Sequence, residues 1–157
     1  MTKLIWGTVL MALTATTVLA QNGGVDYYSA TDLQGMAQQL RQQDSLRTTG
    51  IAPEMLVKYP GHYTMLTIRA VDGRVEEHAH YSDVFFIVDG EASLTTGGTV
   101  VDATTIEPGE IQGTRIEGGV TRKLAKGDVV HISPNIPHQM FIEKGKSLTY
   151  FVVKVKE

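Results

Sequence analysis

Hydrophobic residues follow a helical spacing up to about Gly50 and a strand-like spacing after it. Before Gly50, four apolar residues recur at helical spacing and so share one face: Leu33, Met36, Ala37 and Leu40. Thr31 is placed to cap this helix, with Gln34 as its capping-box partner three residues later. We therefore expect one helix near the N-terminus, packed against the rest of the domain through this face.

After Gly50, short runs of strand-forming residues alternate with turn residues. The candidate strands are residues 63–70, 84–88, 92–95, 129–132 and 148–155. Turn dipeptides separate them: Asp72-Gly73, Asp89-Gly90, Gly97-Gly98, Pro108-Gly109, Gly118-Gly119 and Lys126-Gly127. This spacing predicts an all-β sandwich or barrel. Residues 102–126 are more polar and richer in Gly, which is typical of a hairpin at a barrel rim.

The first twenty residues differ from the remainder. Lys3 precedes an apolar stretch, and Val18-Leu19-Ala20 offers a cleavage site of the signal-peptide type. We expect a signal peptide over residues 1–20, cleaved after Ala20, and an exported periplasmic or secreted protein. An uncleaved membrane anchor is the alternative, but the stretch is short and contains four threonines. Residues 21–157 then form a single domain, with a barrel core at about 60–155.

Composition narrows the possible functions. A chain of 157 residues with 42% hydrophobic residues suits one domain with one core. Its formal net charge is −3 and it has no run of Lys or Arg, which argues against a nucleic-acid partner. It contains no cysteine, so disulfides and thiol chemistry are excluded.

Three histidines and an aspartate are the candidate chemistry. Side chains two residues apart on a strand face the same way, so we expect His78 and His80 to point together. Asp83 follows closely, and His138 comes from a later segment. Three imidazoles and a carboxylate suit a divalent transition metal. The alternatives are a surface His pair and, for Asp83, a hydrogen bond to a His ring instead of a metal bond.

Two segments resemble the motifs of the cupin superfamily. Residues 73–90 contain a Gly, a His-x-His pair, an acidic residue and a closing Gly; residues 127–138 contain a Gly, a Pro and a His. The resemblance implies a double-stranded β-helix, or jelly-roll barrel, with the helix packed outside. It also implies metal ligation by His78, His80, Asp83 and His138. Two departures are Asp83, which replaces Glu and follows His80 after a shorter gap than usual, and Asn135, which replaces a turn Gly and tolerates its left-handed conformation.

Other residues have weaker assignments. Arg69 and Tyr81 are candidate contacts for a small anionic or hydroxylated substrate. Gln139 is expected to face away from His138. The remaining assignments are Glu76 and Glu77 as exposed turn charges, Glu110 and Arg115 as rim or solubilising residues, His62 and His131 as structural or solvent-facing, and Phe85, Phe86, Phe141 and Phe151 as core.

Three functions agree with these features. The resemblance implies a metal-dependent dioxygenase or isomerase of a small organic molecule, with Fe, Mn, Ni, Cu or Zn. The second is a non-catalytic cupin that binds a sugar or metabolite, and the third is an exported protein that keeps the fold without the metal. No catalytic residue can be assigned from the sequence. A homodimer is expected, because cupins often pair through barrel edges and exposed strand edges need cover.

Overall fold

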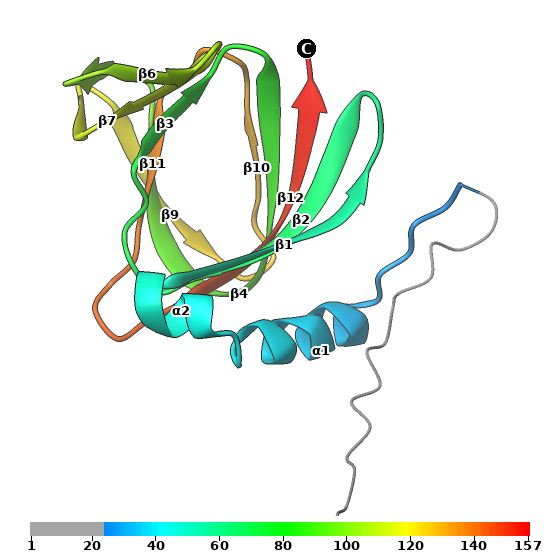
Figure 1. Ribbon diagram of the computed structural model, residues 1–157. Coiled ribbons are helices and arrows are strands. Elements are labelled where there is room, and N and C mark those ends of the chain that lie inside the picture. Colours follow the sequence, from blue (N-terminus) through cyan, green and yellow to red (C-terminus); the bar gives the residue numbers. More distant parts are fainter. Residues whose placement is uncertain (1–23) are drawn as a thin grey trace, which may run out of the picture.

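The computed structural model describes residues 24–157 (Figure 1). The signal peptide predicted over residues 1–20 lies outside the described residues. Two helices, α1 (Ala30–Leu40) and α2 (Asp44–Thr49), precede the strands. Within residues 24–157, no helix is long and apolar enough to cross a membrane.

The first helix begins slightly earlier than the sequence pattern indicated. Ser29, not Thr31, is its N-cap: the Asp32 backbone N–H donates to the Ser29 hydroxyl, and the Ser29 N–H donates to the Asp32 carboxylate. The capping box is therefore formed by Ser29 and Asp32, two residues upstream of the predicted pair. The predicted apolar face is confirmed, because Ala37 and Leu40 are buried in a cluster with residues of the first two strands.

Residues 51–156 form twelve antiparallel strands. They are β1 (Ile51–Lys58), β2 (His62–Arg69), β3 (Val75–His78), β4 (Tyr81–Thr96), β5 (Thr99–Val101), β6 (Thr104–Glu107), β7 (Glu110–Gly113), β8 (Arg115–Glu117), β9 (Val120–Ala125), β10 (Val129–Ile132), β11 (His138–Phe141) and β12 (Leu148–Lys156). The main sheet has ten strands along the path β1-β2-β12-β4-β11-β3-β7-β6, with β9 and β10 also paired to β4. This sheet curls into an open barrel with α1 and α2 outside it (Figure 1). The predicted double-stranded β-helix is confirmed, and the barrel begins at β1, earlier than expected.

The long strand β4 joins the two walls of the barrel. Its first part pairs with β12 and β10, and its second part, from Glu91, pairs with β9 and β11. At the junction Gly90 has φ 86°, and a Cβ there would lie 2.0 Å from the Ser147 carbonyl oxygen. The predicted break between two strands is therefore a bend within one strand.

Alternation along each strand separates the barrel interior from the helix-covered surface. On β2, every second residue from Tyr63 to Arg69 lines the interior, whereas Leu66 and Ile68 are buried under α1. The same rule corrects one core assignment on β4. Phe85 is buried and faces inward, but its neighbour Phe86 faces outward and is 41% exposed.

Candidate metal centre

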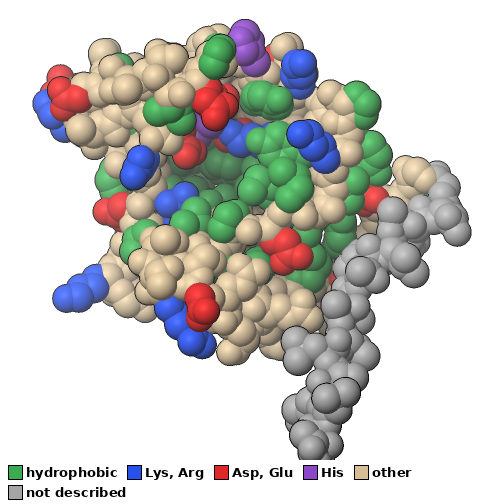
Figure 2. Space-filling view, in the orientation of Figure 1, with side chains coloured by type: hydrophobic (Ala, Val, Ile, Leu, Met, Phe, Trp, Pro, Cys, Tyr) green, Lys and Arg blue, Asp and Glu red, His purple; other side chains and the backbone are tan. Residues whose placement is uncertain are grey.

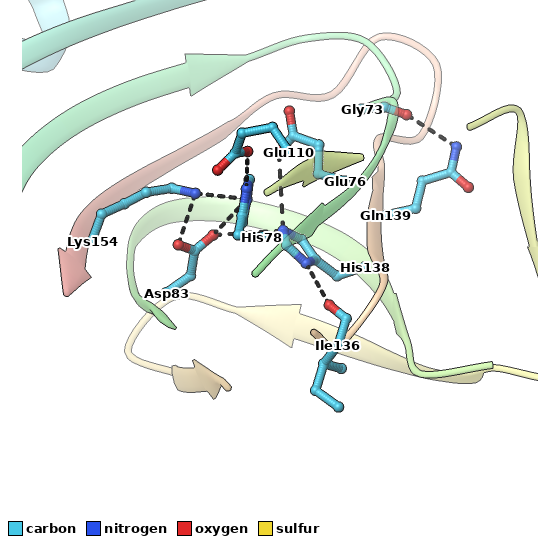
Figure 3. Close-up of polar contacts among 9 residues, drawn as sticks. All are labelled: Gly73, Glu76, His78, Asp83, Glu110, Ile136, His138, Gln139 and Lys154. Carbon is cyan, nitrogen blue, oxygen red and sulfur yellow. Dashed lines mark hydrogen bonds and ion pairs between the residues drawn. The ribbon is translucent and has the colours of Figure 1, made fainter. Parts of the chain in front are cut away.

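The β3 strand places a different pair of side chains in the barrel from the predicted one. It ends at His78, and Ala79 and His80 form a bend beyond it. Alternation therefore places Glu76 and His78 together, and both point toward the same group of side chains (Figure 3). His80 is exposed and lies beside Gly109 in the turn between β6 and β7. The expectation that His78 and His80 face the same way is wrong, because β3 ends before His80.

Asp83 and His138 complete the group from two other strands. His138 on β11 is in register with Glu76 on β3, and Asp83 comes from the start of β4. Asp83 Oδ2 lies 3.6 Å from His78 Nε2 and 3.5 Å from His138 Nε2. His138 Nε2 is also 4.0 Å from Glu76 Oε2. Asp83 and His138 are deeply buried, with exposed fractions of 2% and 5%.

The observation that Glu76 and His78 form the inward-facing pair also explains the short gap between His80 and Asp83. Four residues separate His78 from Asp83, whereas only two separate His80 from it. The unusually short gap to the acid therefore belongs to His80 and not to the pair that enters the barrel. Glu76, expected to be an exposed turn charge, is a half-buried strand residue beside His138.

The hydrogen bonds of the two rings leave both Nε2 atoms facing the centre of the group. His78 Nδ1 is bonded to the Glu110 carboxylate of β7, and His138 Nδ1 donates to the Ile136 carbonyl oxygen at 3.1 Å. A ring that donates through Nδ1 presents its lone pair on Nε2. Burial lowers the pKa of His138 more than the nearby Asp83 carboxylate raises it, which favours the neutral, ligating form.

The His138 ring has one buried nitrogen without a hydrogen-bond partner among the described residues. His138 Nε2 accepts no hydrogen bond from residues 24–157, although it is buried. An unpaired buried acceptor is costly, so such an atom calls for a ligand. Two imidazole nitrogens and two carboxylates match the preferences of a divalent transition metal. The residues present therefore fit a metal ion.

A lysine also enters this group. Lys154 of β12 lies opposite Asp83 in the strand register. Its Nζ is 2.7 Å from His78 Nε2 and forms an ion pair with Asp83 Oδ1 at 2.9 Å (Figure 3). The sequence pattern did not predict that Lys154, Glu76 and Glu110 enter the barrel: Lys154 had no assignment, and the two glutamates were expected to be exposed or rim charges. The alternation of Tyr150, Val152 and Lys154 along the last strand was the signal that would have placed this lysine inside.

A cavity of about 560 Å³ opens above the group. Figure 2 shows this hollow, with hydrophobic walls and acidic, basic and histidine side chains within it. Arg69 and Tyr81, the two predicted substrate contacts, both line it. Its volume is typical of a site for a small organic molecule.

The other assigned residues lie outside this cavity or support its walls. Gln139 points away from His138 and donates to the Gly73 carbonyl oxygen at 3.0 Å (Figure 3). Asn135 has φ 60°, the left-handed conformation expected at its turn. His131 is exposed, and the ring of His62 stacks on Tyr59.

Solved structures of known proteins share this fold at low sequence identity. A conserved protein with a double-stranded β-helix domain from Klebsiella pneumoniae has a TM-score of 0.56 and 12% identity, over 84% of this chain and 85% of that one. The cupin domain of Schizosaccharomyces pombe Cnp3 gives 0.52 and 12%, over 68% of this chain and 65% of that one. The Fe(II) form of HppE has a TM-score of 0.50 and 17% identity, over 67% of this chain and 50% of that one.

The protein has the cupin fold. Neither a protein-family model nor a curated protein matches its sequence. The cupin fold itself supports many activities, so the function must be argued from the side chains in the barrel.

Proposed function

We propose that this cupin binds a divalent transition metal ion through Glu76, His78, Asp83 and His138, and acts there on a small organic molecule. The observation that carries the proposal is the buried, unpartnered Nε2 of His138, which faces Asp83 and Glu76. A bound ion supplies a Lewis acid with positions open to a substrate. Glu110 and the Ile136 carbonyl oxygen hold the two rings in the orientation that ligation requires.

The reaction class we propose is dioxygenation or isomerisation of a small molecule. The cavity supports this proposal because it brings a molecule of suitable size against the ligand group. Fe, Mn, Ni, Cu and Zn are all compatible with two nitrogen and two oxygen ligands. The ion's identity is therefore left to measurement.

A second candidate is a non-catalytic cupin that binds a sugar or metabolite. The ion pair of Lys154 with Asp83 favours it, since the ammonium group already places a cation against the buried carboxylate. In that case the metal is dispensable and the cavity alone holds the ligand. Recovery of an unchanged ligand, with no turnover under any of the five metals, would support this candidate.

Metal analysis of the protein purified without chelators tests the proposal. We expect about one equivalent of a transition metal in the wild type and in His80→Ala, but a large loss in His138→Ala and Glu76→Gln. His80→Ala is the matched control, because His80 lies outside the group. Less than about a tenth of an equivalent in the wild type, without uptake on addition, contradicts a metal site. Loss in His80→Ala with retention in Glu76→Gln would restore the sequence-based ligand set.

We also propose that the protein is exported and forms a homodimer. The signal-peptide pattern of residues 1–20 supports export, and a mature N-terminus at Gln21, measured by mass spectrometry, would verify it. An exposed apolar pair on neighbouring strands, Phe86 with Val129, supports pairing. Elution at monomer size over a wide concentration range would rule out the dimer.

A further inference from the structure

The side chain of Arg69 lies in the barrel beside the candidate metal ligands. Arg69 is the last residue of β2 and occupies an inward-facing position of that strand. It lines the large cavity and also a smaller space of about 30 Å³, whose walls include Glu76 and His138. A molecule that reaches the ligand group through the cavity therefore also meets Arg69.

The guanidinium group has no anionic partner within the described part of the chain. Its Nη1 contacts the Asp72 carbonyl oxygen at 3.5 Å, the outer limit of a hydrogen bond, and its buried Nε has no partner among residues 24–157. No ion pair joins it to a carboxylate in this range, whereas Lys154 in the same cavity is paired with Asp83. A buried N–H donor left unpaired is costly, so the Nε of Arg69 is prepared for an acceptor that arrives from outside.

A tyrosine beside Arg69 adds a second donor. Tyr150 is buried next to the guanidinium group, and burial raises the pKa of its phenol more than Arg69 lowers it. The Tyr150 hydroxyl therefore stays protonated at neutral pH. Together the two side chains offer a planar fork of N–H groups and an O–H, which matches the oxygens of a carboxylate.

Charge and polarity of the cavity limit the class of ligand. Its lining includes three basic side chains, Lys58, Arg69 and Lys154, and four acidic ones, Glu76, Asp83, Glu107 and Glu110. The lining therefore has a formal net charge of −1. A bound divalent cation would change this net charge to +1, which suits a monoanion. Apolar residues such as Met65, Phe85 and Val152 fill much of the remaining wall and suit an organic body better than an inorganic ion.

We propose that the barrel binds a small organic monocarboxylate, whose carboxylate group is held by Arg69 while its other end faces Glu76, His78, Asp83 and His138. The inference rests on the proposed function for the role of the ion, but the contact with Arg69 forms without it. It assigns the substrate class and a residue that determines specificity.

Calorimetric titration with matched probes tests this site. Benzoate, phenylpyruvate, hexanoate and inorganic phosphate are titrated into the protein, both after chelator treatment and after loading with zinc. The neutral benzamide and hexanamide are the comparisons for benzoate and hexanoate. We expect at least one carboxylate to bind about tenfold more tightly than its amide. Arg69→Gln should lower the affinity for that carboxylate about tenfold or more, which is the usual effect of losing a charge-assisted hydrogen bond. Arg122→Gln is the matched control, because Arg122 is exposed on β9 and lines neither of the two spaces that Arg69 lines.

Several results would overturn the proposal. These are no binding by any carboxylate, equal affinity for acid and amide, equal effects of Arg69→Gln and Arg122→Gln, or tighter binding of inorganic phosphate than of any carboxylate. If circular dichroism shows that Arg69→Gln is unfolded, Arg69→Lys keeps the charge but loses the planar fork. It should then bind the carboxylate more weakly than the wild type, and unchanged affinity contradicts recognition by the fork.

Zinc content measured on the same samples separates the two proposals. Arg69→Gln should take up as much zinc as the wild type, because Arg69 is not among the proposed ligands. Carboxylate binding that depends on Arg69 in a protein that takes up no metal would remove the metal site and keep the carboxylate site. Metal uptake without carboxylate binding would keep the metal site and remove the carboxylate site.

Discussion

The His78 ring is held from both of its nitrogens by residues of other strands. Nδ1 is bonded to Glu110 of β7, and Nε2 faces Lys154 of β12 and Asp83 of β4. If His78 ligates a metal ion as proposed, Glu110 orients its ring and Lys154 competes with the ion for its Nε2. Substitution of each should change metal binding in opposite directions.

Glu110→Ala should weaken metal binding. The change removes the acceptor that keeps the proton on His78 Nδ1, and loss of such a partner typically costs ten- to a hundredfold in metal affinity, as an order of magnitude. Competition with a chelating indicator measures the effect. Glu107→Ala is the control on the same hairpin, and an equal loss in both variants would mean that the hairpin acts only through its charge.

Lys154→Met should strengthen metal binding. Without the ammonium group, no cation in this place opposes the incoming ion. The metal-free variant should be less stable by about 3 kcal/mol, because Asp83 is left as a buried, unpaired charge. Chemical denaturation with and without zinc measures both effects, with Lys156→Met at the exposed end of β12 as the control. Weaker zinc binding in Lys154→Met would show that the lysine supports the ion.

At the scale of elements, pairing between distant strands decides where β3 ends and where β4 continues. The β3–β7 register stops at His78 opposite Glu110, and the Ala79 N–H then donates to the Gly109 carbonyl oxygen at 2.7 Å. His80 is thereby left outside the strand. Nothing local to the sequence of residues 73–83 contains this information, since it depends on a hairpin about thirty residues later.

Other features were accessible from the sequence because they depend on local pattern. The apolar face of α1 and the strands at 129–132 and 148–155 follow from periodicity and flanking turns. Asp83 and His138 were predicted from their positions in the two cupin-like motifs, and the structure places Asp83 Oδ2 3.5 Å from His138 Nε2. Lys154 and Glu110 were not, because a charged residue within a strand or hairpin usually faces water, and only the curling of the sheet turns these two inward.

Gly90→Ala should strongly destabilise the fold at the bend of β4. The residue has a left-handed φ of 86°, and its new Cβ would lie 2.0 Å from the Ser147 backbone. We expect a loss of at least about 2 kcal/mol in the free energy of unfolding, measured by urea denaturation. Gly97→Ala has a similar φ of 73° but nothing within 4 Å, so it reports the backbone strain alone. Equal losses in the two variants would mean that the contact with Ser147 relaxes freely.

At the scale of the whole molecule, the proposed ligands connect the two walls of the barrel. Glu76, His78 and His138 come from β3 and β11, and Asp83 comes from the part of β4 that pairs with β10 and β12. An ion bound by all four would link the walls only in the folded state. Metal binding should therefore be coupled to global stability.

Addition of the metal that the protein takes up should raise its melting temperature. A ligand at a hundredfold excess over its Kd stabilises the folded state by about 2.7 kcal/mol, which is several degrees for a domain of this size. Differential scanning calorimetry measures the shift. His138→Ala should show none, and an equal shift in that variant would place the bound ion elsewhere.

The two strands of the β6–β7 hairpin should differ in how well they tolerate amino-acid substitutions. β7 pairs with β3 and contributes Glu110, whereas β6 pairs only with β7 and its residues are all exposed. Ile106 and Glu107 of β6 nevertheless line the cavity. Substitutions on β6 should therefore change the shape of the cavity wall, while β7 and its contact between Glu110 and His78 are left unchanged. Directed evolution of new ligand preferences would best begin on this outer strand.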